Sequence, residues 1–150
     1  MSGEQEKGII GEIQEDGLPV IYRLVDELPD QDIRASYSWL TVVSWKYDGL
    51  DRNGMPPEGT NQRMIALEHA IDALEETELC RHAYSRTGNH LKELVYYISS
   101  REQFMEALNS ALAHHPPYPI EINFYDDTEW EDFQKLLDLF RGKAKVVPPN

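Results

Sequence analysis

The stretch YSWLTVVSWKY, residues 37–47, decides how the rest of the chain can fold. It is rich in β-branched and aromatic residues, which favour a strand. Leu40 and Val42 lie on one face of such a strand. Val43 and Trp45 lie on the other face. Because apolar side chains occur on both faces, the pattern predicts a central strand with packed structure on either side.

The residues after this stretch predict a helix, a hairpin, a second helix and a last strand. A loop rich in glycine and proline leads to an apolar stripe at helical spacing over about 61–77. Two strands follow at 79–85 and 91–99, joined by a turn at Thr87, Gly88 and Asn89. A second helix then leads to a strand at 120–125, which alternates apolar and polar residues.

This succession predicts an α+β fold of the ferredoxin-like type, a β-α-β-β-α-β sandwich with an antiparallel sheet in the order 4-1-3-2. That order makes the first and third strands central, and these are the two that carry apolar residues on both faces. The second and fourth strands are expected at the edges. The second one contains Arg81 and His82, which suits an edge.

Three further parts complete a single expected domain of residues 1–150, whose core is about 37–125. An Asp16-Gly17 pair between apolar runs predicts an N-terminal hairpin at about 8–25. An acidic connection follows at 26–34, and a C-terminal helix is expected at about 128–141, with a cap from Thr128 and Glu131 and an end at Gly142. The hairpin and this helix are expected to cover the second sheet face, although an open aromatic binding face is the alternative. Residues 1–7 and 143–150 are expected to be flexible.

Composition excludes several classes of partner. The 150 residues contain 27 acids and 14 bases, for a net charge of −13. Binding to nucleic acid or to an anionic membrane needs clustered lysine and arginine, so neither is expected as a direct partner. The charge either keeps the protein soluble or steers a basic protein partner. One cysteine, a polar N-terminus and no apolar run of about 20 residues predict a cytoplasmic protein.

No complete catalytic, metal or cofactor motif occurs in the sequence. The loop that follows Asp48 resembles a calcium loop, but its first ligand position falls on Gly49 and its closing position on Thr60. The histidines, His82 among them, lack metal-site spacing and are expected at the surface. Cys80 shares a strand face with His82, yet a buried apolar role suits this thiol best. We therefore predict no catalytic residue, no metal ligand and no cofactor.

Four motifs occur in order along the chain and together carry a family resemblance. They are DRNGMP at 51–56, Thr87-Gly88-Asn89 followed by Glu93 and Tyr97, YPIE at 118–121 and DTEW at 127–130. The chain from about Pro19 onward resembles the bacterial DUF695 family, a domain of unknown function. It is more distantly similar to the type B regulators of ribonuclease E activity, which are acidic ferredoxin-like proteins that inhibit the nuclease by binding it. The resemblance implies a protein-binding regulator.

The leading functional hypothesis is a non-catalytic protein-binding or regulatory module with a partner that is basic. The alternative is an enzyme of unrecognised type, whose site would lie between the Asp51–Pro56 loop, the Thr87–Asn89 turn and Trp130. Self-association through an edge strand, such as the one with Arg81 and His82, is a third hypothesis. The candidate binding surface consists of Asp51, Asn53, Gly54, Thr87, Gly88, Asn89, Tyr97 and Trp130.

Overall fold

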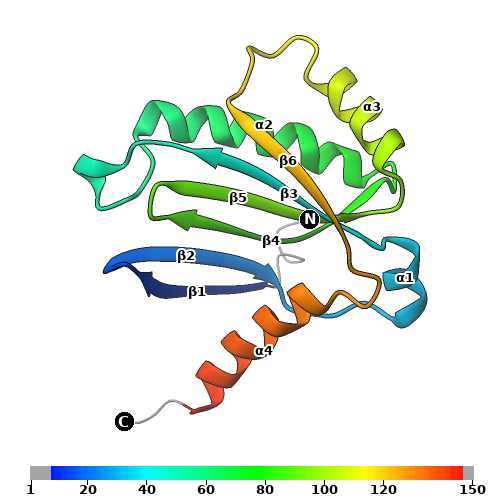
Figure 1. The fold of residues 1–150 in the computed structure, drawn as a ribbon, viewed down its shortest axis with the longest axis horizontal. Helices are drawn as coiled ribbons and strands as arrows, with labels where there is room; N and C mark the ends of the chain where they lie inside the picture. Colours follow the sequence, from blue (N-terminus) through cyan, green and yellow to red (C-terminus); the bar gives the residue numbers. More distant parts are fainter. Residues whose placement is uncertain (1–7, 147–150) are drawn as a thin grey trace, which may run out of the picture.

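The computed structural model describes residues 8–146, and its central feature is a six-stranded antiparallel sheet in the order β1-β2-β4-β5-β3-β6 (Figure 1). The strands are β1 (Gly8–Glu15), β2 (Leu18–Val25), β3 (Trp39–Lys46), β4 (Cys80–Gly88), β5 (Leu91–Ile98) and β6 (Ile120–Asp126). The helices are α1 (Gln31–Ser36), α2 (Glu58–Glu75), α3 (Arg101–Ala111) and α4 (Glu131–Val146), and Leu50–Arg52 forms a short 3-10 turn, η2. The α+β class expected from the sequence is confirmed.

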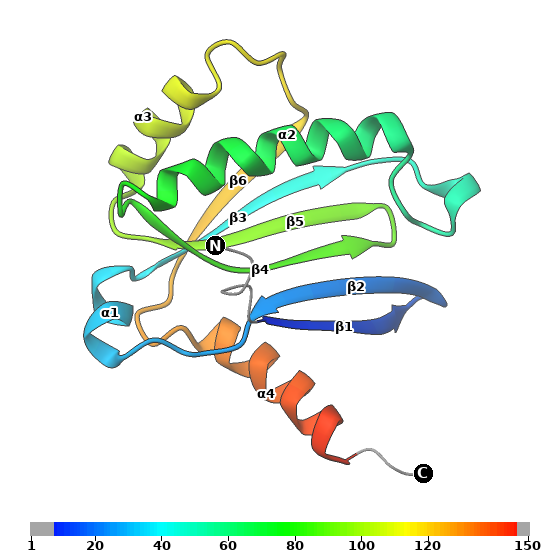
Figure 2. The ribbon, with the colours of Figure 1, turned by 180° about the vertical axis from the view of Figure 1, so that it is seen from behind.

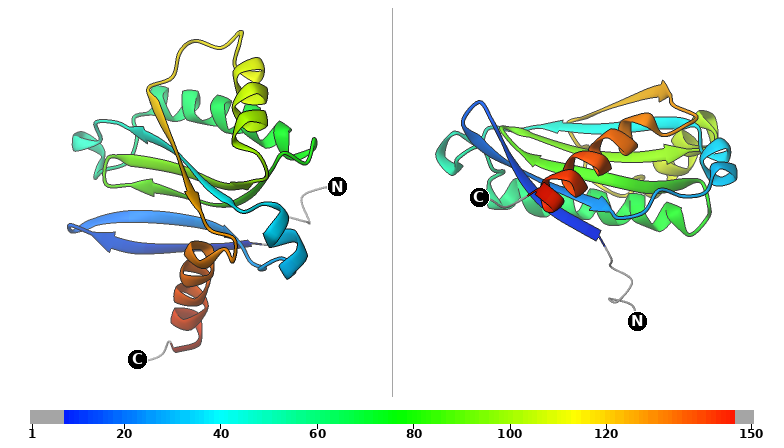
Figure 3. Two further views of the ribbon diagram at one scale, coloured as in Figure 1. Left: turned by 45° about the vertical axis from the view of Figure 1, so that its right-hand side comes forward. Right: turned by 90° about the horizontal axis from the view of Figure 1, so that it is seen from below.

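The helices lie on both faces of the sheet. α2 and α3 cover one face, and α4 crosses the other face next to the hairpin β1-β2 (Figures 1 and 3). Seen from behind, α1 lies at the end of the sheet where β3 begins and close to the start of α4 (Figure 2). The expectation that the last helix covers the second sheet face is therefore confirmed.

Strand β3 contributes side chains to two cores, as its two apolar faces predict. Val43 and Trp45 are buried in the first core, which α2 and α3 close with Leu67 and Phe104. Leu40 is buried in the second core, under α4. The second core also contains Val95, Tyr97, Trp130, Phe133 and Leu137. Because full burial of one such apolar side chain is worth about 1.5–3 kcal/mol, both cores contribute strongly to stability.

The N-terminal hairpin extends the sheet and does not cover it, which corrects two expectations. Val20–Leu24 of β2 pair with Tyr84–Gly88 of β4, so β4 lies in the interior of the sheet and not at its edge. The hairpin turn is at Asp16 and Gly17, with φ of 52° and 80°, as the Asp-Gly pair predicts. An isolated two-stranded hairpin is marginally stable in water, and pairing with β4 gives it a third strand.

The turn between β4 and β5 lies later than predicted. Thr87 and Gly88, expected in the turn, belong to β4 and pair with β5. The turn consists of Asn89 and His90, with φ of 49° and 66°. Two successive residues with positive φ are typical of the tight hairpin turn that matches strand twist.

Helix boundaries also differ from the expected ones. α2 begins at Glu58 and ends at Glu75, three and two residues earlier than the range 61–77. α1 forms inside the stretch that was expected to be only a connection. α4 does not end at Gly142, because this glycine lacks the positive φ of a helix-ending glycine, and the helix continues to Val146. The expected flexible segments 1–7 and 147–150 lie outside the described residues, whereas 143–146 belong to α4.

The start of α4 uses a different cap from the one predicted. The backbone N–H groups of Glu131 and Asp132 donate to the Asp127 carboxylate at 2.8 and 3.1 Å. The Thr128 hydroxyl donates to Asp126 instead of capping the helix. A carboxylate at this position satisfies two free N–H groups and also favours the positive end of the helix dipole.

Candidate functional site

Six of the eight residues predicted as a binding surface gather at one end of the sheet. They come from the loop after β3, from the end of β4 and from the turn that follows β4, and they are Asp51, Asn53, Gly54, Thr87, Gly88 and Asn89. Hydrogen bonds join the two segments. The His90 N–H donates to the Gly54 carbonyl at 3.0 Å, and the Tyr47 hydroxyl donates to the same carbonyl at 2.6 Å. The Gly49 N–H donates to Nδ1 of His90 at 3.0 Å.

The end of β4 and the turn after it also contact the N-terminal hairpin. Nδ2 of Asn89 donates to the carboxylates of Glu15 and Asp16 at 3.3 and 3.1 Å. Gly88 lies so close to β2 that a Cβ would stand 2.3 Å from the Pro19 carbonyl oxygen. These contacts account for a glycine and an asparagine here by packing alone.

Tyr97 and Trp130 lie elsewhere, in the second core. Tyr97 is six residues along β5 from Leu91, which is about 20 Å at about 3.3 Å per residue. Its ring stacks on Trp130 with centroids 4.0 Å apart. The Tyr97 hydroxyl donates to Asp127 at 2.8 Å, and the Trp130 indole N–H donates to the Tyr37 carbonyl at 2.9 Å. The structure therefore does not bring together the three segments of the alternative enzyme site.

A different surface is hollowed, at the place where β2 and β4 separate. Two adjoining hollows of about 720 and 700 Å³ share Val25, Glu75 and His82, and we call them together the β4 groove. The first hollow lies beside Cys80–His82 and is also lined by Asp26, Glu27, Pro29, Tyr37, Glu78 and Trp130. The second lies between the hairpin and α2 and is also lined by Gly8, Ile9, Ile10, Arg23, Leu24, Ile65, Glu68, His69, Asp72 and Ser85.

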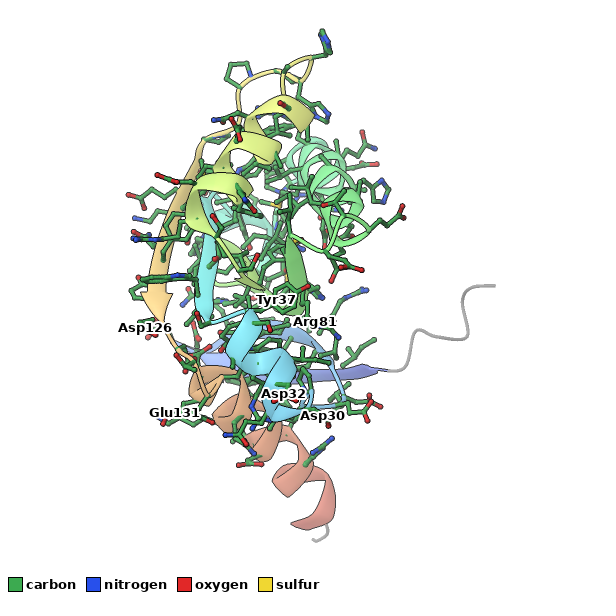
Figure 4. The ribbon with its side chains drawn as sticks, turned by 90° about the vertical axis from the view of Figure 1, so that its right-hand side faces the viewer. Asp30, Asp32, Tyr37, Arg81, Asp126 and Glu131 are labelled. Carbon is green, nitrogen blue, oxygen red and sulfur yellow. The ribbon has the colours of Figure 1, made fainter. Side chains whose placement is uncertain are left out.

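The β4 groove is acidic. The arginines in its lining are Arg23 and Arg81. The Arg81 guanidinium lies over the Tyr37 ring, 5.7 Å from its centroid, and Figure 4 shows the two side by side where α1 meets β4. The acids that line the groove are Asp26, Glu27, Glu68, Asp72, Glu75 and Glu78. This excess of negative charge favours a cationic occupant.

Glu75 is half-buried and Asp72 is more exposed, and within residues 8–146 neither carboxylate forms an ion pair. Burial raises the pKa of Glu75, although the His82 N–H that donates to its carboxylate partly offsets the effect. Burial also raises the pKa of Asp72, which accepts a hydrogen bond from the Tyr96 hydroxyl at 3.2 Å. A cation in the groove would stabilise both charged forms and lower both pKa values.

Cys80 and His82 face the same core but do not form a reactive pair. Burial, together with Glu75 and Asp72, raises the pKa of the Cys80 thiol to about 12, so the thiol stays protonated at neutral pH. His82 is half-buried, which corrects its expected surface position. Its ring packs edge-on against Tyr96 with centroids 5.2 Å apart, and burial lowers its pKa. Nε2 of His82 is buried and has no hydrogen-bond partner among the described residues.

Comparison with known proteins identifies the family but not a characterised relative. The profile of DUF695, a family of unknown function, matches residues 13–137. The chain belongs to the DUF695 family. No curated protein and no solved structure matches the chain significantly. The part of the chain that matches DUF695 includes β2, β4 and α2, which form most of the β4 groove.

The described residues offer neither a cluster of metal ligands nor a membrane-spanning helix. Within residues 8–146 of this DUF695 protein, no group of three or more His, Cys, Asp or Glu side chains is placed to hold a metal ion. In the same range, the helices are all too short or too polar to cross a membrane.

Sequence reasoning did not find the β4 groove. Asp26 and Glu27 lie in the stretch that the sequence predicts only as an acidic connection. The groove forms only because the hairpin joins β4 and then turns away after Val25. The available signal was the density of acids at 26–32 and 75–78, next to the ends of two predicted strands.

Proposed function

We propose that this DUF695 protein is a non-catalytic protein-binding module that receives a basic segment of its partner in the β4 groove. The observation that carries the proposal is the lining of that groove, in which six carboxylates face two arginines. Lysine or arginine side chains would form charge-assisted hydrogen bonds with these carboxylates. The net charge of −13 would speed the approach of such a partner.

Several of the carboxylates are available to a partner. In residues 8–146, no hydrogen bond or ion pair engages the side chains of Asp26, Glu27 or Glu78. Burial has already removed part of the water around Glu75 and Asp72. A groove of this kind therefore gains more from a cation than a solvated acidic surface does.

We also propose a regulatory role in the cytoplasm. The similarity to the type B regulators of ribonuclease E activity supports a nuclease as the first partner to test. A ferredoxin-like core is part of this proposal, and the neighbour order β4-β5-β3-β6 within the sheet supports it. The lone buried thiol of Cys80 suits a reducing compartment.

The proposal is tested by charge reversal in the groove. Glu27→Lys with Glu78→Lys should weaken capture of a basic protein partner, or inhibition of ribonuclease E, at least tenfold at low salt. The matched control is Glu106→Lys with Glu121→Lys, two exposed acids on α3 and β6. The control should bind within about twofold of the unmodified protein, because surface charges contribute little individually. Equal effects of the two double variants would contradict the proposal.

A further inference from the structure

At its Cys80 end, β4 has a neighbouring strand on one side only. β2 pairs with Tyr84–Gly88, whereas Cys80–His82 lie beyond the last paired residue of β2 and pair only with β5. The register shifts between His82 and Tyr84, and the hairpin strand ends at Val25 before the chain turns into α1. A strand end with one neighbouring strand can pair with an extended chain on its open side.

The hydrogen bond made by His82 shows which way the backbone faces. Its N–H donates to the Glu75 carboxylate in the last turn of α2, and not to β5. Since the N–H and C=O of one strand residue point to the same side, the His82 carbonyl also faces the groove. The Glu75 carboxylate thus occupies the position where the carbonyl of a neighbouring strand would accept this hydrogen bond.

The first hollow of the β4 groove lies along this open stretch. Its volume of about 720 Å³ is lined on one side by Cys80–His82 and on the other by the residues that follow β2. Val25, Pro29 and Tyr37 supply apolar contact area, and the acids of the same hollow are Asp26, Glu27, Glu75 and Glu78. An extended chain with alternating apolar and basic residues matches this combination, because successive strand side chains point to opposite sides.

We infer that Cys80–Ala83 bind an extended basic peptide as an added strand of the sheet. This inference rests on the proposed function, because it specifies how the basic segment sits in the groove. The His82 carbonyl would accept a backbone hydrogen bond from the peptide, and its N–H would become available when a lysine or arginine of the peptide draws the Glu75 carboxylate away. The acids would select lysine or arginine. A second copy of the chain fits this place poorly, since each copy carries a charge of −13 and the same acidic groove.

The experiment uses the full chain and blocked twelve-residue peptides. The probe alternates lysine and valine, and a second form has its four central amides N-methylated, which keeps the charge but removes the hydrogen-bond donors. A third peptide alternates glutamate and valine. Affinities are measured by fluorescence anisotropy at low salt, and the site is located by amide NMR shifts. The lysine peptide should bind at least tenfold more tightly than its N-methylated form, with shifts concentrated at Cys80–Ala83 and Val25–Glu27.

Each outcome separates strand addition from charge attraction. Equal binding of the plain and N-methylated lysine peptides would overturn strand addition and leave the proposed function standing. Equal or tighter binding of spermidine, or shifts confined to β1 or β6, would also overturn it. If the lysine peptide binds no better than the glutamate peptide, the proposed function fails as well. Glu27→Lys with Glu78→Lys should abolish the difference between lysine and glutamate peptides, whereas Glu106→Lys with Glu121→Lys should preserve it.

Discussion

At the scale of single residues, Trp130 connects α4 to the rest of the molecule. Its φ of 60° is unusual for a bulky residue, yet the side chain is buried. The indole stacks on Tyr97 and donates to the Tyr37 carbonyl, so it links β5, the end of α1 and the start of α4. These contacts offset a backbone cost of about 1–3 kcal/mol for such a conformation. Trp130 is thus best explained as a packing residue.

The Tyr97 hydroxyl offers a direct test of this arrangement. It donates to Asp127 at 2.8 Å and accepts the Phe133 N–H at 3.4 Å, in a part-buried position. Tyr97→Phe keeps the stacked ring but leaves Asp127 and Phe133 with one partner fewer. We expect a loss of about 1–2 kcal/mol in the free energy of unfolding, measured in urea. Tyr125→Phe on β6, where the tyrosine is 52% exposed, should change it by less than about 0.5 kcal/mol. Similar losses in both variants would contradict this account.

His82 should make stability depend on pH. Burial lowers its pKa, while Glu68 opposes this effect and Lys92 adds to it. Below about pH 6.5 the unfolded chain takes up a proton that the folded chain rejects. The contribution of His82 is therefore present above pH 6.5 and is lost as the pH falls toward its folded pKa.

The matched variant for this effect is His82→Phe, which keeps a ring against Tyr96 but cannot titrate. Between pH 7.5 and 5, urea unfolding should show a smaller loss of stability for the variant than for the unmodified protein. The raised pKa values of Asp72 and Glu75 act in the opposite direction over acidic pH, but they are present in both proteins. Parallel pH profiles would show that His82 does not titrate differently in the folded state.

At the scale of elements, the sequence predicts those features of strands and turns that depend only on residues close together in the chain. The two apolar faces of β3 follow from residues 37–47, and the Asp16-Gly17 turn follows from its own two residues. The pairing of β2 with β4 joins segments about 65 residues apart, and nothing in either strand specifies that neighbour. α1 has six residues and no buried side chain, so it leaves no periodic pattern. The β4 groove depends on both of these features, which explains why the sequence singles out Arg81, His82 and Trp130 but does not predict the groove.

Gly88 shows how a turn signal can mislead. The glycine was interpreted as a turn former, but its place is inside β4, with φ 149° and Pro19 in close approach. Gly88→Ala should destabilise the protein by about 1–3 kcal/mol, because the added methyl group overpacks the β2–β4 contact. Thermal unfolding measures the change. Gly59→Ala is the control in the first turns of α2, where nothing lies within 4 Å of a Cβ, and it should be neutral or stabilising by up to about 1 kcal/mol.

At the scale of the whole molecule, one sheet separates two cores and belongs to both. β3 and β5 each place apolar side chains on both faces, so neither core can lose its packing while the sheet stays intact. The hairpin and α4 belong to the second core through Ile9, Ile13 and Phe140. The chain should therefore unfold as one cooperative unit although its helices are divided between two faces.

The three tryptophans allow this cooperativity to be measured on each face. Trp45 is buried in the first core and Trp39 packs against it, whereas Trp130 is buried in the second. A variant with Trp39→Phe and Trp130→Phe retains Trp45 as its fluorophore, and one with Trp39→Phe and Trp45→Phe retains Trp130. Within each variant, the fluorescence and far-UV circular dichroism midpoints in urea should coincide, even though the two variants differ in stability. A Trp130 midpoint clearly below the circular dichroism midpoint would mean that α4 and the hairpin detach first, which the shared strands β3 and β5 argue against.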